Sequence, residues 1–218
     1  QKTINGYVYE NHEHDGKYHD EAVPLANIYW QGTTNAVVAD ENGNWLNGDT
    51  LGLLTSQILD IDALAVPVSC NTAIEKSHSF KQVVRTKIGS PYVIAEFSEL
   101  KKKFTHIAGF EANGGYLLGS DIRINDKVLT ALPTRDALLP AFMVLSQQQP
   151  ISVQLRKLPQ RFSASDRLQN FARKYSLELI EGLQQDATNF LTELGYEECY
   201  ELNTTDGLRI TLECGDIV

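Results

Sequence analysis

The regular alternation of strand-like and helix-like segments between residues 49 and 147 is the feature that most constrains the fold. Residues 63–68 form a continuous apolar run, which is typical of a strand buried on both faces. Helical patterns lie on either side of it, and Asp49 and Ser90 are the expected N-caps of those two helices. Because further short strands follow, the sequence predicts an α/β fold with a mixed, largely parallel sheet flanked by helices.

The pattern changes near residue 156. Pro159 ends a short helix expected at 151–158, and an extended stretch follows it. One amphipathic helix is then predicted over residues 177–194, with Gly195 as its C-cap, before further strands. We therefore expect three parts, namely a strand-rich N-terminal segment (1–34), an α/β domain (35–156) and a partial α+β domain (157–218).

The charge of the chain limits its partners. The formal net charge is −9, and no basic field is present that would collect the phosphates of nucleic acid or of an anionic membrane. No apolar run approaches the roughly 18 residues that a membrane-spanning helix needs. The three cysteines are far apart and lack metal-ligand spacing, which favours a reduced, cytoplasmic setting. We expect a cytoplasmic protein that binds neither nucleic acid nor membranes.

A loop directly after an expected buried strand carries the clearest candidate chemistry. It reads Glu111-Ala112-Asn113-Gly114-Gly115. The two glycines allow a tight turn with positive φ, and a carboxylate beside an amide can hydrogen-bond two adjacent sugar hydroxyls. The alternative is a structural turn with a solvated glutamate.

A second candidate is the run Lys87-Ile88-Gly89-Ser90, which is expected to join a strand to a helix. Backbone amides at the start of a helix suit an anion, although an ordinary helix N-cap would look the same. Farther along, a helix is expected to begin at Thr134 or Asp136, and Arg135 with Asp136 is interpreted as capping and an ion pair.

Several segments together resemble a known family. They cover residues 67–73, 85–93, 109–116, 132–137, 162–168 and 205–210. Their order and spacing resemble the third domain and the start of the fourth domain of the phosphohexomutases of the phosphomannomutase and phosphoglucomutase type. Members of that family move a phosphoryl group between two positions of a hexose through a phosphoserine, with magnesium.

The resemblance implies a hexose phosphate, of mannose or glucose, as the ligand. It places sugar recognition and the lining of the cleft on seven residues, namely Glu111, Asn113, Gly114, Gly115, Lys87, Gly89 and Ser90. Nothing in the chain resembles the serine-bearing first domain or the phosphate-clamping loop, so we expect an incomplete form without catalytic residues. The positions that align with the magnesium loop, residues 30–34, contain no carboxylate, so no cofactor is expected in this chain.

Two other functions remain open at this point. The chain could be a non-catalytic sugar-phosphate binder, or an interaction module whose N-terminal strands pair with a second copy or with missing mutase domains. The polar stretch 11–21, interpreted as a hairpin loop, contains His12, His14 and His19 among acidic residues. Such a cluster could bind a transition metal, since His-x-His on a strand puts both residues on one face.

Overall fold

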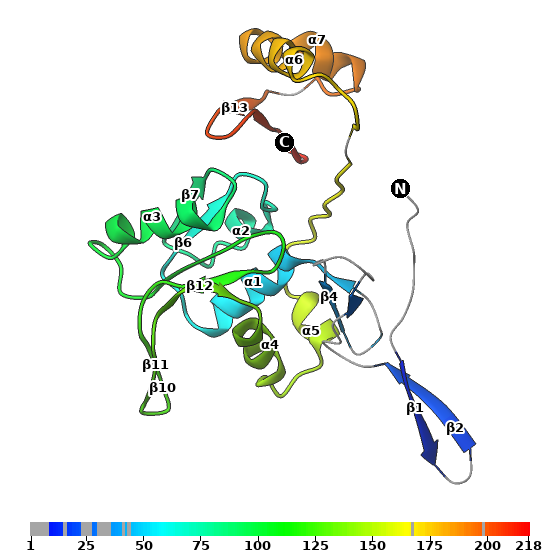
Figure 1. The fold of residues 1–218 in the computed structure, drawn as a ribbon, viewed down its shortest axis with the longest axis vertical. Coiled ribbons are helices and arrows are strands. Elements are labelled where there is room, and N and C mark those ends of the chain that lie inside the picture. The colour runs from blue at the N-terminus through cyan, green and yellow to red at the C-terminus, as the bar shows by residue number, and fades with distance from the viewer. Residues whose placement is uncertain are drawn as a thin grey trace.

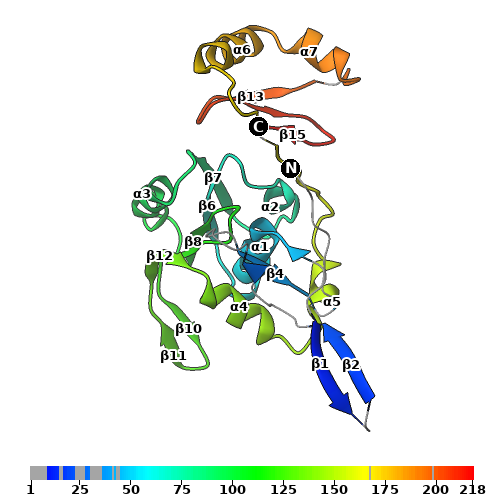
Figure 2. The same ribbon diagram turned by 45° about the vertical axis from the view of Figure 1, so that its right-hand side comes forward.

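The computed structural model describes residues 9–14, 17–22, 28–29, 36–40, 42, 45–166, 168–197 and 199–218, and only the backbone of the strands before residue 40. Its centre is a five-stranded sheet (Figures 1 and 2) with the order β12-β9-β8-β6-β7. The strands are β6 (Ala63–Pro67), β7 (Gln82–Thr86), β8 (Ile107–Phe110), β9 (Tyr116–Leu118) and β12 (Leu132–Asp136). Strand β6 runs parallel to β7 and β8, whereas β9 is antiparallel to β8 and to β12. The mixed sheet expected from the sequence is therefore confirmed.

Helices cover both faces of this sheet. They are α1 (Gly48–Ile58), α2 (Ala73–Lys76), α3 (Ser90–Leu100), α4 (Leu138–Leu145) and α5 (Ile151–Leu155). All of β6 is buried, and its side chains alternate between two cores, as a strand between two layers requires. Ala63 and Ala65 pack with α3, while Leu64 and Val66 pack with Phe110 and the other face. This packing explains the unbroken apolar run in the sequence.

Helix α1 approaches β8 closely because it carries glycines where it meets the sheet. A Cβ on Gly52 would lie 2.4–2.8 Å from three ring atoms of Phe110, which is shorter than any van der Waals contact. A Cβ on Gly48 would lie 2.2 Å from the Gly114 nitrogen and 2.4 Å from the Ala112 carbonyl oxygen. The start of α1 is therefore pressed against the turn that follows β8.

The N-terminal strands form two small sheets. Strands β1 (Tyr9–His14) and β2 (Lys17–Ala22) pair only with each other among the described strands, and β3 (Ile28–Tyr29), β4 (Ala36–Ala39) and β5 (Trp45–Leu46) form a second sheet. The interpretation of residues 11–21 as a loop was wrong, because residues 11–14 and 17–21 lie in two paired strands. Later in the chain, β10 (Ile122–Ile124) and β11 (Lys127–Leu129) form a second hairpin. It turns at Asn125 and Asp126, as the sequence predicts.

The C-terminal unit follows an extended stretch that begins after Pro159 (Figure 1). It contains α6 (Arg173–Gln185), α7 (Thr188–Glu193) and an antiparallel sheet of β13 (Glu201–Asn203), β14 (Arg209–Thr211) and β15 (Asp216–Ile217). The single helix predicted over 177–194 is wrong. The chain becomes extended at Asp186, whose carboxylate accepts a 2.8 Å hydrogen bond from the Thr188 amide and so begins a new helix.

The structure corrects three helix starts. Helix α1 is capped by Asn47, whose side chain accepts from the Thr50 amide at 2.8 Å, and not by Asp49. Helix α3 has Gly89 as its N-cap, without a side-chain bond. For the helix expected to begin at Thr134 or Asp136, Thr134 is wrong because it lies in β12, whereas capping by Asp136 is confirmed, since Asp136 accepts from the amides of Leu138 and Leu139 ahead of α4. Within the described part of the chain, every helix is too short or too polar to span a bilayer.

We predict opposite effects from two helical Gly→Ala substitutions. Gly52→Ala should lower the free energy of unfolding by about 1–3 kcal/mol, because the new methyl group overlaps the Phe110 ring. Gly182→Ala, in α6, has nothing within 4 Å of the new atom and should stabilise its helix by about 0.5–1 kcal/mol. Hydrogen exchange of amides within α1 and α6 measures each effect separately. A stabilising Gly52→Ala would show that α1 does not touch β8 closely.

Candidate functional site

Three loops meet at one edge of the sheet because β6, β7 and β8 are parallel. The carboxyl ends of parallel strands share an edge, where open α/β sheets bind their ligands. The loops are 68–72 after β6, 87–89 after β7 and 111–115 after β8. Since β6 lies between the other two strands, the 87–89 turn and the 111–115 turn stand on opposite sides of loop 68–72.

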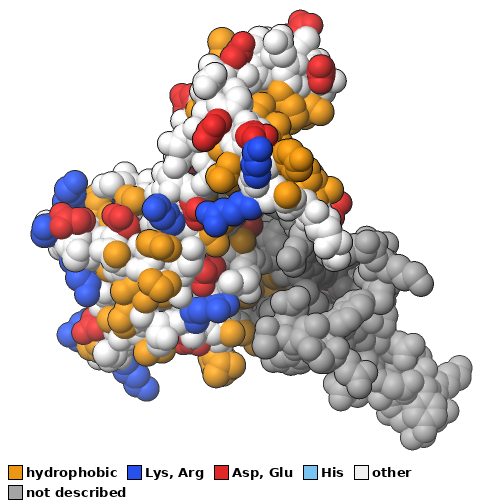
Figure 3. All heavy atoms as spheres, turned by 45° about the horizontal axis from the view of Figure 1, so that its top comes forward, with side chains coloured by type: hydrophobic (Ala, Val, Ile, Leu, Met, Phe, Trp, Pro, Cys, Tyr) orange, Lys and Arg blue, Asp and Glu red, His pale blue; other side chains and the backbone are white. Residues whose placement is uncertain are grey.

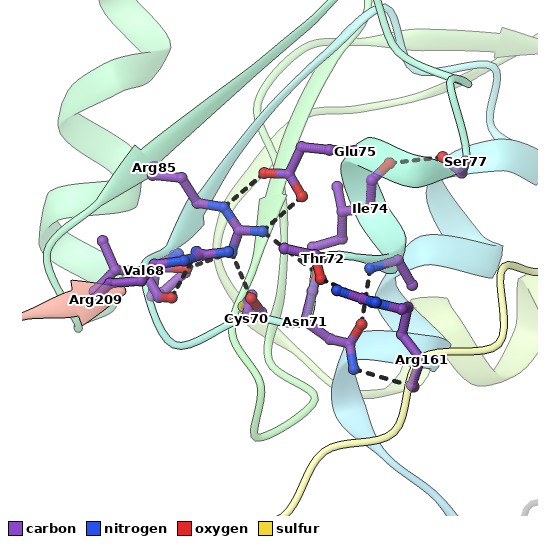
Figure 4. Close-up of polar contacts among 12 residues, drawn as sticks. Val68, Cys70, Asn71, Thr72, Ile74, Glu75, Ser77, Arg85, Arg161 and Arg209 are labelled. Carbon is purple, nitrogen blue, oxygen red and sulfur yellow. Dashed lines mark hydrogen bonds and ion pairs between the residues drawn. The ribbon is translucent and has the colours of Figure 1, made fainter. Parts of the chain in front are cut away.

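Arg85 at the end of β7 fixes loop 68–72 (Figure 4). Its Nη1 donates to the carbonyl oxygens of Pro67 at 3.0 Å and Cys70 at 2.6 Å. Its Nε and Nη2 both donate at 2.7 Å to the carboxylate of Glu75 in α2. Such a bidentate pair is both strong and directional. Sequence reasoning did not single out Arg85, because its partners lie in a loop and a helix that only the sheet register brings to it.

The C-terminal unit attaches to the same loop (Figure 4). Asn71 Nδ2 donates to the Arg161 carbonyl oxygen at 3.1 Å, and Arg161 Nε donates to Thr72 Oγ1 at 3.2 Å. Arg209 in β14 is buried and donates from Nη1 to the Val68 carbonyl oxygen at 2.8 Å. The Ile88 amide donates to Asp206 Oδ2 at 2.8 Å. The loops after β6 and β7 are thus contacted by both parts of the chain.

A groove of about 860 Å³ lies between the two parts. Its walls are residues 69–72 and Ile88 on one side, and residues 160–166, 206–208 and the chain around Cys214 on the other. In Figure 3, acidic and basic side chains are interspersed, and hydrophobic side chains appear on both the α/β domain and the C-terminal unit. The volume of the groove lies within the size range of ordinary ligand sites, but among the described residues none of Lys87, Gly89, Ser90 or the 111–115 turn lines it.

The turn after β8 has the conformation expected from its glycines. The Glu111 amide donates to the Gly115 carbonyl oxygen at 3.0 Å, and the Gly114 amide donates to the Glu111 carbonyl oxygen at 2.9 Å. Asn113 Oδ1 accepts from the Gly115 amide at 3.1 Å. Gly114 has φ +89°, which favours glycine. Part of the hydrogen-bonding capacity of Asn113 is therefore used within the turn, although its side chain remains exposed.

The Glu111 carboxylate is buried, with the residue only 7% exposed. Arg135 Nε lies 3.3 Å from Glu111 Oε2, an ion pair whose geometry does not make a hydrogen bond. Glu111 Oε2 therefore accepts no hydrogen bond from any residue that the structure describes. The Arg135 side chain is 55% exposed and forms the outer cover of this carboxylate. The expected pairing of Arg135 with Asp136 is replaced by one with Glu111.

The turn after β7 combines the backbone at the start of α3 with the Lys87 ammonium group. Gly89 has φ +129°, and its carbonyl oxygen accepts from the Tyr92 amide at 3.1 Å as α3 begins. The Lys87 ammonium lies 5.9 Å from the centroid of the Tyr92 ring, within cation–π range. Ser90 is the first residue of α3. Of the four residues 87–90, only Ile88 contributes to the walls of the groove as the described residues define it.

Cys70 of loop 68–72 and Asp49 of α1 form a buried pair at this edge. Burial raises the pKa of Asp49, an effect that the Cys70 thiol, the Asn71 backbone amide and the charge of Arg85 oppose. Burial and the Asp49 charge raise the pKa of Cys70 well above its ordinary range. A protonated, buried thiol is a poor nucleophile, so Cys70 is a packing residue at this edge.

Metal ligation is limited among the described side chains. No group of three or more His, Cys, Asp or Glu residues there is arranged to hold a metal ion. Residues 30–34, which align with the magnesium loop in the family resemblance, lie outside the described residues.

Comparisons with known proteins agree with this geometry. Residues 47–175 match the family described as phosphoglucomutase/phosphomannomutase, alpha/beta/alpha domain III. The chain is 52% identical over 186 residues to a phosphomannomutase of Salmonella muenchen, and 36% identical over 192 residues to one of Sinorhizobium fredii (strain NBRC 101917 / NGR234). Each match covers 84% of this chain but only 39% and 40% of the respective relative.

A solved structure shares the fold. The crystal structure of a phosphoglucomutase/phosphomannomutase family protein from Burkholderia thailandensis matches with a TM-score of 0.57 at 18% identity, over 82% of this chain and 35% of that chain. At this level of identity the match concerns the arrangement of the elements. It agrees with the α/β sheet and its flanking helices.

We predict that Arg85→Met destabilises loop 68–72 at the carboxyl ends of the parallel strands. The substitution removes the Arg85 donor from the Cys70 carbonyl oxygen, and from the Pro67 carbonyl oxygen it removes one of two donors, the other being the Cys70 amide. It should lower the free energy of unfolding by about 2–3 kcal/mol. Urea unfolding measures this loss. Lys81→Met is the matched control, because Lys81 pairs with Asp62 at an exposed position and should matter much less. Equal losses from the two variants would contradict a special role for Arg85.

We also predict selective cysteine reactivity. At about pH 8, near the ordinary thiol pKa, the exposed Cys199 and Cys214 should react with a thiol reagent, whereas Cys70 should remain protonated and protected. Mass spectrometry of the labelled chain, with and without denaturant, identifies the sites. Rapid native labelling of Cys70 would contradict the buried Asp49–Cys70 pair.

Proposed function

Because this chain belongs to the phosphoglucomutase/phosphomannomutase family, we propose that it recognises the hexose phosphate of a phosphomannomutase-type reaction. That reaction transfers a phosphoryl group between two positions of a hexose. The curated relatives are phosphomannomutases, and the chain spans about two fifths of their length, 39% and 40%. Its proposed part in the reaction is to hold the sugar phosphate, with mannose and glucose phosphates as the substrate class.

The buried oxygen Glu111 Oε2 is the single observation that carries this proposal. A buried acceptor without a hydrogen bond costs about 1–3 kcal/mol, and more when it is charged. A sugar hydroxyl placed against this oxygen would remove that cost and gain a charge-assisted bond. The exposed Arg135 side chain covers the carboxylate and can swing away to admit a ligand. The hydrogen-bonded turn keeps Glu111 in place, so recognition requires little ordering of the backbone.

The phosphate end of the ligand would lie near the turn after β7. The start of α3 at Ser90 carries the positive end of the helix dipole, and Lys87 adds a full charge beside it. Strands β8 and β7 are separated by two strand spacings, about 10 Å in all. A hexose phosphate lying across loop 68–72 would therefore point its hydroxyls at Glu111 and Asn113 and its phosphate at the Lys87 turn.

The described residues contribute recognition and do not supply a nucleophile. Cys70 is protonated and buried, and phosphoryl transfer in the family depends on a phosphoserine and magnesium. The described side chains do not fit a magnesium site, and residues 30–34 contain no carboxylate, so no step proposed for this chain uses that ion. The free thiols of Cys70, Cys199 and Cys214 support a cytoplasmic location for this function.

Calorimetric titration of mannose 6-phosphate into the chain tests the proposal. Binding should weaken by about 10- to 100-fold in Glu111→Gln, because the variant loses a charge-assisted hydrogen bond to the sugar. Glu193→Gln, at an exposed position of α7, is the matched control and should bind as the parent does. Inorganic phosphate should bind more weakly than the sugar phosphate and should be insensitive to Glu111→Gln.

Two results would reject the proposal. One is the absence of heat at millimolar mannose or glucose 6-phosphate in a chain whose circular dichroism shows that it is folded. The other is unchanged affinity in Glu111→Gln, which would reduce the 111–115 turn to a structural feature.

A further inference from the structure

The hairpin β1–β2 has a register that places all three of its histidines on one face. His12 stands directly opposite His19, and His14 stands opposite Lys17. Residues that face each other across an antiparallel pair share a face, and so do residues two apart on one strand. His12, His14 and His19 therefore lie on the same face of the hairpin, although their side chains are outside the described part of the structure.

The same register adds two carboxylate residues to this face. Glu10 stands opposite Glu21, and each is two residues from a histidine. The opposite face carries the remaining paired residues of the two strands, namely Tyr9, Asn11, Glu13, Tyr18, Asp20 and Ala22. The sequence thus sorts every histidine of the hairpin to one side, together with Glu10 and Glu21. Lys17 shares this face at the turn end, beside His14.

The Cα spacings among the three histidines are short enough for them to share one metal ion. Directly paired residues have Cα atoms about 4.5–5.5 Å apart, and residues two apart on a strand about 6.6 Å. Diagonal neighbours across the pair, such as His14 and His19, are about 7–8 Å apart and remain within reach of long side chains. Three residues at these spacings form a compact triangle on the hairpin face.

From this juxtaposition we infer that the face formed by His12, His14 and His19 binds a divalent transition-metal ion of the zinc type. Imidazole nitrogens are ligands for Zn²⁺, Cu²⁺ and Ni²⁺, and three histidines with one open position are an established zinc set. Glu10 and Glu21 share this face, and carboxylates are also a ligand type for such ions. Magnesium prefers oxygen ligands, so this site is distinct from the magnesium loop of the family.

The hairpin is also placed where a surface site can form. Strands β1 and β2 make a sheet of their own, and Figures 1 and 2 both draw it apart from the five-stranded sheet. An isolated two-stranded hairpin is at best marginally stable in water. A bound ion joining β1 to β2 would stabilise the pairing, because it binds only the folded arrangement.

Zinc titration of the full chain, prepared without an affinity tag and freed of metal by a chelator, tests this inference. Calorimetry should give one Zn²⁺ per chain, and Co²⁺ should give the absorption of a tetrahedral nitrogen site. His12→Ala, His14→Ala and His19→Ala should each weaken zinc binding by at least about tenfold. Asn11→Ala and Asp20→Asn, on the other face, and His78→Ala and His106→Ala, in the α/β domain, should leave it unchanged.

A further pair of substitutions distinguishes the loss of a metal ligand from the loss of the hairpin fold. His19→Glu replaces one metal ligand by another and should retain measurable zinc binding, whereas His19→Ala should lose it. Zinc affinity that is unchanged when all three hairpin histidines are replaced would overturn the inference. So would the absence of zinc binding in a parent chain whose circular dichroism shows the expected fold.

Discussion

The hydrogen bonds from Arg85 to loop 68–72 are the interaction on which the carboxyl edge depends. The loop leaves a fully buried strand of the sheet, and the carbonyl oxygens of Pro67, at the end of that strand, and Cys70, in the loop, both accept from Arg85. A guanidinium with five donors in a fixed fork can satisfy two of these carbonyls and a carboxylate at once, which a lysine ammonium cannot do with the same geometry. The parallel pairing of Val66 with Arg85 brings this fork to the loop.

The contacts on both sides of the loop then follow from its fixed path. Asn71 and Thr72 can meet Arg161, and Val68 can meet Arg209, because the loop backbone is held. These contacts, together with the bond between Ile88 and Asp206, attach the C-terminal unit to loops at the sheet edge. The C-terminal unit has its own small core, whose buried members are Ala187, Leu191, Ile210 and Leu212. Hydrogen bonds around the groove therefore join the two parts, and polar contacts of this kind are usual between domains.

Much of the fold could be predicted from the sequence where local patterns and burial agree. The apolar run at 63–68 became β6, and the Asn125-Asp126 turn lies where the pattern placed it. The errors came where two local signals compete. The apolar face of 177–194 continues through Asp186, but an aspartate side chain that caps the next turn ends one helix and begins another. Hydrophobic spacing alone cannot reveal such a break.

In the candidate site, too, local features could be predicted from the sequence and long-range contacts could not. The sequence identified Glu111 and the glycines around it, because a turn after a buried strand is a local feature. It could not identify Arg135 as the neighbour of that carboxylate, because β12 reaches Glu111 only through its antiparallel pairing with β9, where Asp136 stands opposite Tyr116. The chemical state of Glu111 thus depends on strand order, a property of the whole sheet. Glu111 Oε2 became a candidate contact for a sugar hydroxyl because Arg135, its ion-pair partner among the described residues, is largely exposed and leaves this oxygen without a hydrogen bond.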